Sequence, residues 1–267
     1  MQRRQFLNSS LAASALAISN AAALEAQTTA GISGREYYEL RRYQLQSGPQ
    51  TKLTAKYVAE ALIPALNRLG MKTVGAFDLY LGEQTPALYL LIPSTSLETL
   101  VTSELLLAKD DEYQKAGEAF ISAAAKEPAY IRIESSISIA FEGFPKLMLP
   151  PDRMQHPKRV YQLRTYESPS TAAHRRKVEM FNSGEFAIFA KAGFWNMFFS
   201  DTLIGSRLPS LTYMVGLPDL TQLDAKWQAF SADPDWKKLV GSPRFNYEAI
   251  VSDISNLIVK PTSYSQI

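Results

Sequence analysis

One seven-residue pattern occurs twice in the chain, as YYELRRY at residues 37–43 and as VYQLRTY at residues 160–166. The two copies are separated by a constant offset of 123 residues and keep the same four positions: Tyr38/Tyr161, Leu40/Leu163, Arg41/Arg164 and Tyr43/Tyr166. Internal self-similarity at a fixed offset indicates a duplicated structural unit. The repeat therefore predicts that the chain consists of two copies of one fold.

The same order of elements follows both copies. A helical pattern comes first, over residues 51–70 and 171–193, and Pro64 in one helix and Gly184 in the other interrupt its second half. Two apolar strands, a second helix and a last strand then follow: residues 75–82, 87–93, 96–126 and 130–141 in the first copy, and residues 193–200, 211–218, a helix from about 220, and 247–259 in the second. The order β-α-β-β-α-β is that of a ferredoxin-like unit, so the sequence predicts the α+β class.

A proline-rich stretch divides the two units. Residues 143–157, GFPKLMLPPDRMQHP, contain four prolines, which is too many for a helix or a central strand. The predicted organisation is a first domain over residues 36–142, a linker over residues 143–157 and a second domain over residues 158–262.

The middle strands of each unit are apolar on both faces. On one strand Phe77 and Leu79 alternate with Tyr80, and on its counterpart Trp195 alternates with Phe198. A sheet covered by helices on one side would expose one of these faces, which is unfavourable for a soluble protein. The two sheets are therefore expected to pack face to face as an intrachain α+β barrel.

The repeated words YELRRY and YQLRTY, the glycines Gly70 and Gly193 that close the first helices, and the segment WQAFSADPDW at residues 227–236 resemble the NIPSNAP family. The resemblance covers about residues 36–262. It implies a dimeric α+β barrel, here formed within one chain, and it implies no settled reaction. Animal members of the family are linked to mitochondria and vesicle trafficking.

The N-terminus has the features of an export signal. Arg3 and Arg4 precede a moderately apolar, alanine-rich run of 14 residues, Leu11–Leu24, and small residues follow. Adjacent arginines followed by Phe-Leu are typical of a twin-arginine signal, here over residues 1–26. The run is shorter than the roughly 20 residues of a spanning helix, so we expect no stable membrane span and an exported, periplasmic or otherwise extracytoplasmic protein.

The composition and the motifs exclude several classes of chemistry. The chain has no cysteine, and its 28 Lys and Arg nearly balance its 26 Asp and Glu, so neither thiolate chemistry nor a nucleic-acid partner is predicted. It contains no phosphate-binding glycine loop and no nucleophile elbow. His156 and His174 are not spaced with a second metal ligand and are expected to be solvated, so neither a metal site nor a cofactor is predicted.

The remaining candidate site is the mixed face of the two repeated strands. Side chains alternate along a strand, so the Tyr/Leu set shares one face and the arginines share the other. The Tyr/Leu face suits the helix-covered side, which places the mixed face in the shared barrel interior as a candidate ligand-binding lining: Tyr37, Glu39, Arg41, Tyr43, Arg164 and Tyr166. Structural ties across the barrel are the alternative role. Gln162 replaces Glu39 in the second copy, so Arg164 is the arginine expected to anchor a ligand.

Three functions remain open on the sequence alone. The first is a protein that binds a small acidic or carbonyl-bearing ligand, or a protein partner, through the barrel. The second is an α+β-barrel oxidoreductase, either monooxygenase-like or haem-dependent. The third is a structural assembly module. A homo-oligomer is compatible with each of them.

We predict that the exported protein begins between residues 24 and 28, because small residues follow the short apolar run there. N-terminal sequencing of the protein from the extracytoplasmic fraction measures this directly. An intact Met1 on membrane-bound protein would contradict it.

Overall fold

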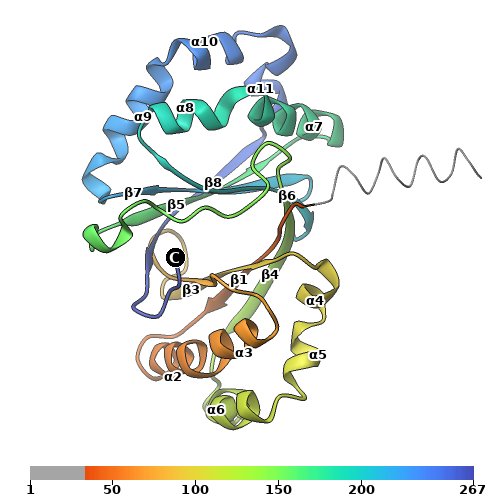
Figure 1. Ribbon diagram of the computed structural model, residues 1–267, viewed down its shortest axis with the longest axis vertical. Helices are drawn as coiled ribbons and strands as arrows, with labels where there is room; N and C mark the ends of the chain where they lie inside the picture. The colour runs from red at the N-terminus through yellow and green to blue at the C-terminus, as the bar shows by residue number, and fades with distance from the viewer. Residues whose placement is uncertain (1–33) are drawn as a thin grey trace, which may run out of the picture. The chain divides into compact units, whose positions relative to one another are not determined.

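Eight strands close into one antiparallel barrel within residues 34–267, which are the residues described by the computed structural model (Figure 1). They follow one another around the barrel in the order β1-β3-β2-β8-β5-β7-β6-β4. Residues 36–267 form one compact unit. The predicted α+β class and the intrachain α+β barrel are confirmed. The predicted signal segment, residues 1–26, lies outside the described residues.

The first repeat has the predicted order of strands and helices. Its elements are β1 (Tyr37–Gln44), α2 (Pro49–Tyr57), the π-helix η1 (Val58–Leu62), α3 (Ile63–Arg68), β2 (Gly75–Leu81), β3 (Ala87–Ser94), α4 (Leu97–Val101), α5 (Ser103–Leu107), α6 (Asp111–Ile121) and β4 (Arg132–Ala140). The predicted second helix is broken into α4, α5 and α6, and side chains of Ser96 and Asp110 cap the first and last of these.

The second repeat follows the same order, after the short 3-10 helix η2 (Arg153–Gln155) in the linker. Its elements are β5 (Val160–Glu167), α7 (Thr171–Met180), the π-helix η3 (Phe181–Glu185), α8 (Phe186–Lys191), β6 (Trp195–Ile204), β7 (Ser210–Leu217), η4 (Leu220–Gln222), α9 (Leu223–Ala232), α10 (Pro234–Val240), η5 (Pro243–Phe245), α11 (Tyr247–Ile250) and β8 (Asp253–Pro261). The last strand begins later than predicted, because residues 247–250 form a helical turn in which the Val251 N–H donates to the Tyr247 carbonyl.

Two seams join the sheets into a barrel, and helices cover the outside. β2 pairs with β8 and β4 pairs with β6, so neither sheet keeps a free edge. The helices of the first repeat lie outside the sheet that contains β1 and β3, and those of the second lie outside the sheet that contains β5 and β7 (Figure 1). The order of layers is therefore helices, sheet, sheet, helices.

The barrel interior is an apolar core to which all eight strands contribute. Its buried members are Tyr38, Phe77, Leu79, Ala87, Tyr89, Leu91, Ala140, Tyr161, Leu163, Met197, Phe198, Met214, Val259 and Ile267. Separate cores lie between each sheet and its own helices. In β6 a bulge between Asn196 and Phe198 shifts the alternation, so Phe198 points inward and Phe199 points toward the helices.

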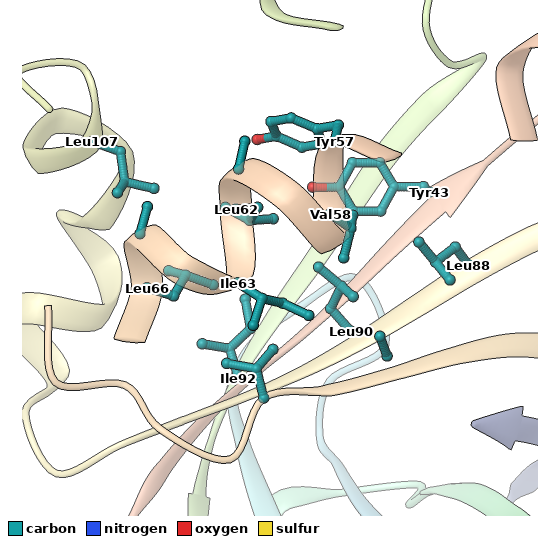
Figure 2. Close-up of a cluster of buried hydrophobic side chains, with 14 of the residues drawn as sticks. Tyr43, Tyr57, Val58, Leu62, Ile63, Leu66, Leu88, Leu90, Ile92 and Leu107 are labelled. Carbon is teal, nitrogen blue, oxygen red and sulfur yellow. The ribbon is translucent and has the colours of Figure 1, made fainter. Parts of the chain in front are cut away.

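The predicted assignment of the two faces was wrong. Tyr38 and Leu40 point into the barrel, as do Tyr161 and Leu163, whereas the mixed set faces the helices. Figure 2 shows Tyr43 of β1 packed against Tyr57 and Val58 of the first helix. The middle of the enclosed barrel accepts the Tyr/Leu set, because polar groups there would lack partners, while helix surfaces supply partners for charges. The six candidate residues Tyr37, Glu39, Arg41, Tyr43, Arg164 and Tyr166 are therefore not barrel-lining.

The interruption of the first helix is the same feature in both repeats. The two π-helices, Val58–Leu62 and Phe181–Glu185, are separated by the offset of the repeated strands, 123 residues. Single-turn π-helices of this kind often occur at functional sites. The second contains Gly184 at φ 133°, a backbone conformation that favours glycine.

The linker and the C-terminal segment cover one end of the barrel. Leu147 packs against the interior core, and its N–H donates to the Glu36 carboxylate at 2.7 Å. Ile267 is buried in the same core, and Gln266 exchanges hydrogen bonds with the backbone of Val74. Within residues 34–267, no helix is both long and apolar enough to cross a membrane.

We predict that the two repeats do not fold separately. Cleavage of the chain near Pro151 would expose the apolar barrel face of each half, at about 25 cal/mol per Å² of apolar surface. Each isolated half should aggregate or pair with itself, as measured by sedimentation. Two stable monomeric halves would contradict a shared barrel core.

Candidate functional site

The arginine of the first repeat is fully neutralised. Arg41 is buried and donates to both carboxylate oxygens of Glu39, at 2.7 and 3.1 Å, and to Glu104 of α5 at 2.6 Å. It also donates to the Tyr43 hydroxyl at 3.4 Å, and Ser135 donates to Glu39 at 2.6 Å. One cation therefore meets two carboxylates, so Arg41 ties the sheet to the helices.

The arginine of the second repeat has lost both carboxylates. Gln162 stands at the position of Glu39, and Trp227 of α9 stands at the position of Glu104. The indole N–H of Trp227 donates to the Gln162 side-chain oxygen at 2.8 Å. The Arg164 guanidinium lies over the Trp227 ring, 4.5 Å from its centre, and 5.3 Å from the centre of the Tyr166 ring. Its buried Nε has no hydrogen-bond partner, and among the described residues no carboxylate forms an ion pair with it.

A buried ion pair lies in the same layer of the second repeat. Lys177 of α7 donates to the two carboxylate oxygens of Glu185 at 3.1 and 2.8 Å, and the two side chains are 0% and 2% exposed. Aromatic rings surround the ammonium group at 4.4–5.8 Å: Phe181, Tyr247, Tyr166 and Trp236. Since Lys177 precedes the π-helix and Glu185 ends it, the pair bridges the interrupted helix across the Gly184 turn.

The charge balance of the two layers is opposite. The first repeat places one cation, Arg41, between two carboxylates. The second places two cations, Arg164 and Lys177, around the single carboxylate of Glu185. Burial raises the pKa of Glu185, while the nearby Lys177 and Arg164 oppose that shift. The layer of the second repeat therefore has an excess of positive charge that an anionic or carbonyl oxygen would complement.

Tyrosine hydroxyls complete this layer. The hydroxyls of Tyr166 and Tyr213 lie 2.9 Å apart, and their rings meet edge to face. Burial raises the pKa of both Tyr213 and Tyr247 above the ordinary value, so both hydroxyls stay protonated at neutral pH. The arrangement offers an oxygen ligand a guanidinium, a phenol and an indole face.

The prediction that His174 is solvated was wrong. The side chain is buried between α7 and β6, and its Nε2 lies 2.7 Å from Oδ1 of Asp201. Within residues 34–267, Nδ1 has no hydrogen-bond partner. His156 of the linker is partly exposed, with its ring 5.2 Å from that of Trp195. The carboxylate partner of His174 comes from a strand 27 residues away, so no local motif signalled it.

The structure brings the predicted residues together in two separate groups rather than one. Arg41, Tyr43 and Glu39 meet in the first repeat, with Tyr37 packed beside the same core, and Arg164 meets Tyr166 in the second. Sequence reasoning missed Lys177 and Glu185. Lys177 and Glu185 are eight residues apart, on either side of the predicted helix interruption. Charged residues with this spacing also occur on ordinary solvated helices, so the spacing alone did not indicate a buried pair.

Comparisons with known proteins identify the second repeat. Residues 161–266 match the family model described as NIPSNAP. The first repeat lies outside the matched residues. No curated protein matches the sequence.

Similar solved structures include both single-repeat and full-length relatives. An uncharacterized NIPSNAP-like domain protein from Burkholderia xenovorans is 24% identical over 41% of this chain and 90% of its own, with a TM-score of 0.37. Two putative monooxygenases, from Lactobacillus acidophilus and Fusobacterium nucleatum, are 7% identical over 85% of this chain and 94% and 92% of theirs, with TM-scores of 0.51 and 0.52. These two share the fold over most of the chain.

We predict that removing one member of the Lys177–Glu185 pair lowers the free energy of unfolding much more than replacing both members with apolar residues. Lys177→Met leaves a buried carboxylate without its cation, which should lower the free energy of unfolding by about 3–5 kcal/mol. The double variant Lys177→Met/Glu185→Leu should recover most of this loss. Urea denaturation of both variants measures the effect, and an equal loss in both would contradict a coupled pair.

Proposed function

We propose that this chain, whose second repeat matches the NIPSNAP family model, is an exported binding protein that holds a small acidic or carbonyl-bearing molecule at Arg164. The ligand would lie in the helix–sheet layer of the second repeat, against Tyr166 and Trp227. The export part of the proposal is supported by the arginine pair and the short apolar run of residues 1–26.

The unmatched guanidinium of Arg164 carries the proposal. A partly buried cation without a carboxylate partner is unfavourable, and its Nε donor is left unpaired. The aromatic faces of Trp227 and Tyr166 compensate only in part, since a cation over an exposed or half-buried ring gains about 0.5–2 kcal/mol. A carboxylate or carbonyl oxygen would satisfy the remaining donor.

Arg41 of the first repeat is the internal comparison for the proposed role of Arg164. At Arg41 the same strand position is occupied by a guanidinium that two carboxylates saturate. If the repeated arginine were only a structural tie, the same carboxylate partners would be expected in both repeats. The exchange of both carboxylates for Gln162 and Trp227 removes the tie and leaves a donor group beside an aromatic wall.

The barrel interior is a poorer location for a polar ligand. The side chains that fill it are apolar or aromatic, and among them Tyr38, Tyr161 and Phe198 are almost fully buried. Arg42 shares this face of β1 toward one end of the barrel but is already paired with Glu134 at 2.7 Å, so an acidic molecule in the interior would lose its hydration and have to compete with Glu134 for that cation.

We predict different effects of the same substitution at the two arginines. Arg41→Met should lower the free energy of unfolding by about 3 kcal/mol, because Glu39 stays buried without its cation although Ser135 still donates to it. Arg164→Met orphans no neighbouring carboxylate, since Glu185 keeps Lys177, and should change stability little. It should instead remove binding.

Binding would be measured calorimetrically with benzoate as the acidic probe, benzaldehyde as the carbonyl probe and toluene as the apolar control. Loss of benzoate or benzaldehyde binding in Arg164→Met, with binding kept in a folded Arg41 variant such as Arg41→Lys, is the expected result. Equal destabilisation by both methionine substitutions, with no probe bound, would assign both arginines a structural role.

An oxidoreductase is the second candidate. Its support is that two structural neighbours covering most of the chain are named putative monooxygenases. Purification from the native host, with an absorption spectrum and native mass spectrometry, distinguishes the two functions. Bound haem, flavin or quinone would favour the oxidoreductase, whereas a colourless protein carrying a small acid would favour the binding protein.

A further inference from the structure

A groove runs along the outside of the second repeat, between its two helical segments. It has a volume of about 400 Å³ and is lined from η3 and α8 on one side and from α10 and η5 on the other: Ser183, Gly184, Ala187, Ile188, Asp235, Lys238, Leu239, Ser242 and Phe245. The volume lies at the small end of the roughly 300–1,000 Å³ typical of ligand pockets. None of these residues contributes to the Arg164 site.

The groove exists because the second helices of the two repeats differ. In the first repeat α6 packs directly against α2 and η1, and Gly117 permits this approach, since a Cβ there would meet the Tyr57 ring at 3.3 Å. The residue at the same offset in α10 is Val240, whose branched side chain requires the space that Gly117 leaves. α10 has its close backbone contacts with α9 instead of with η3.

The shorter length of α10 adds to its separation from η3. α6 has 11 residues, whereas α10 has 7 and ends at Val240, where the chain turns away into η5. Both helices begin with a capping aspartate, Asp110 and Asp233, so they start at equivalent positions. The groove therefore opens at the site where the first repeat continues its helix for one more turn.

The floor of the groove is apolar. Ile188 and Phe245 are buried, and Leu239 is partly buried beside them. Gly184 adds no side chain, and a Cβ built there would meet no atom within 4 Å, so the groove is unobstructed at the π-helix. Such a floor suits an apolar chain or ring.

The rim carries one uncompensated charge. Asp235 is paired with Lys191 across one end of the groove, between α10 and α8. Lys238 forms no ion pair with any residue that the structure describes, although, after the hydrogen bond from Lys191, its charge helps to lower the pKa of Asp235. The hydroxyls of Ser183 and Ser242 are the other polar groups of the lining. Counted with Lys191, the rim has two lysines and one carboxylate, so its net charge is positive and complements an anionic head group.

We propose that this groove binds a small amphiphile with an apolar body and one anionic head, such as a medium-chain carboxylate. The body lies on Ile188, Leu239 and Phe245, and the head pairs with Lys238. This site is separate from the one at Arg164 and does not depend on it.

The test uses decanoate as the probe, with decyltrimethylammonium as the cationic control, and isothermal calorimetry on the full folded chain. Ala187→Leu places a bulky side chain in the groove, and Ala190→Leu is its match on the exposed face of the same helix, outside the groove. Decanoate binding should be lost in Ala187→Leu and kept in Ala190→Leu. Benzoate binding should be the same in both, which separates this site from the one at Arg164.

The charge is tested by a second matched pair. Lys238→Gln should weaken decanoate binding by about two- to fivefold, the effect of one exposed ion pair, while Lys237→Gln leaves it unchanged. Melting temperatures of all four variants check that they fold. Equal loss in both alanine variants, equal effects of both lysine variants, or binding of decyltrimethylammonium as tight as that of decanoate would each overturn the proposal.

Discussion

The closure of two four-stranded sheets into one barrel determines which side chains of each strand face the core and which face the helices. Once β2 pairs with β8 and β4 with β6, each strand has an inner face whose middle part is buried in one shared core. That buried part is apolar, because a polar side chain there would lose hydration without gaining a partner, whereas Arg42 and Glu134 pair with each other toward one end of the barrel. The Tyr/Leu set of each repeated strand satisfies this requirement, and the arginines are consequently directed to the helices.

The layer between sheet and helices is then the place where the two repeats can differ in charge. In the first repeat it holds Arg41 between Glu39 and Glu104. In the second it holds Arg164 against Trp227 and a separate Lys177–Glu185 pair. The same backbone therefore supports a saturated ion network on one side of the barrel and a cationic, aromatic layer on the other. The π-helix is common to both, so the difference arises from side chains rather than from the fold.

The sequence predicted the architecture well because the repeated strand, the interrupted helix and the proline-rich linker are local patterns. It did not predict which face of the strand points inward, since alternation states only which residues share a face. The prediction that Tyr43 and Arg41 share one face of β1 was correct, but the prediction that this face lines the barrel was wrong. The partners of His174 and Lys177 were missed because side-chain contacts between elements leave no periodic signal. The groove was missed for a related reason, since the effect of Val240 in place of Gly117 depends on how closely two helices approach.

Duplication within one chain has a physical consequence that a symmetric dimer does not share. In a homodimeric α+β barrel each substitution appears in both halves, so a change that opens one helix pair or removes one ion network is imposed twice. In a tandem chain the first repeat can keep the tight α6–η1 contact and the neutralised Arg41, which stabilise the common barrel, while the second departs from both. Contacts in the first repeat then offset the free-energy cost of two features of the second: an arginine without a carboxylate partner, and a helix pair that does not pack closely. The covalent linker permits this division between a stabilising repeat and a diverged repeat, because fusion lets the two halves carry different sequences while sharing one core.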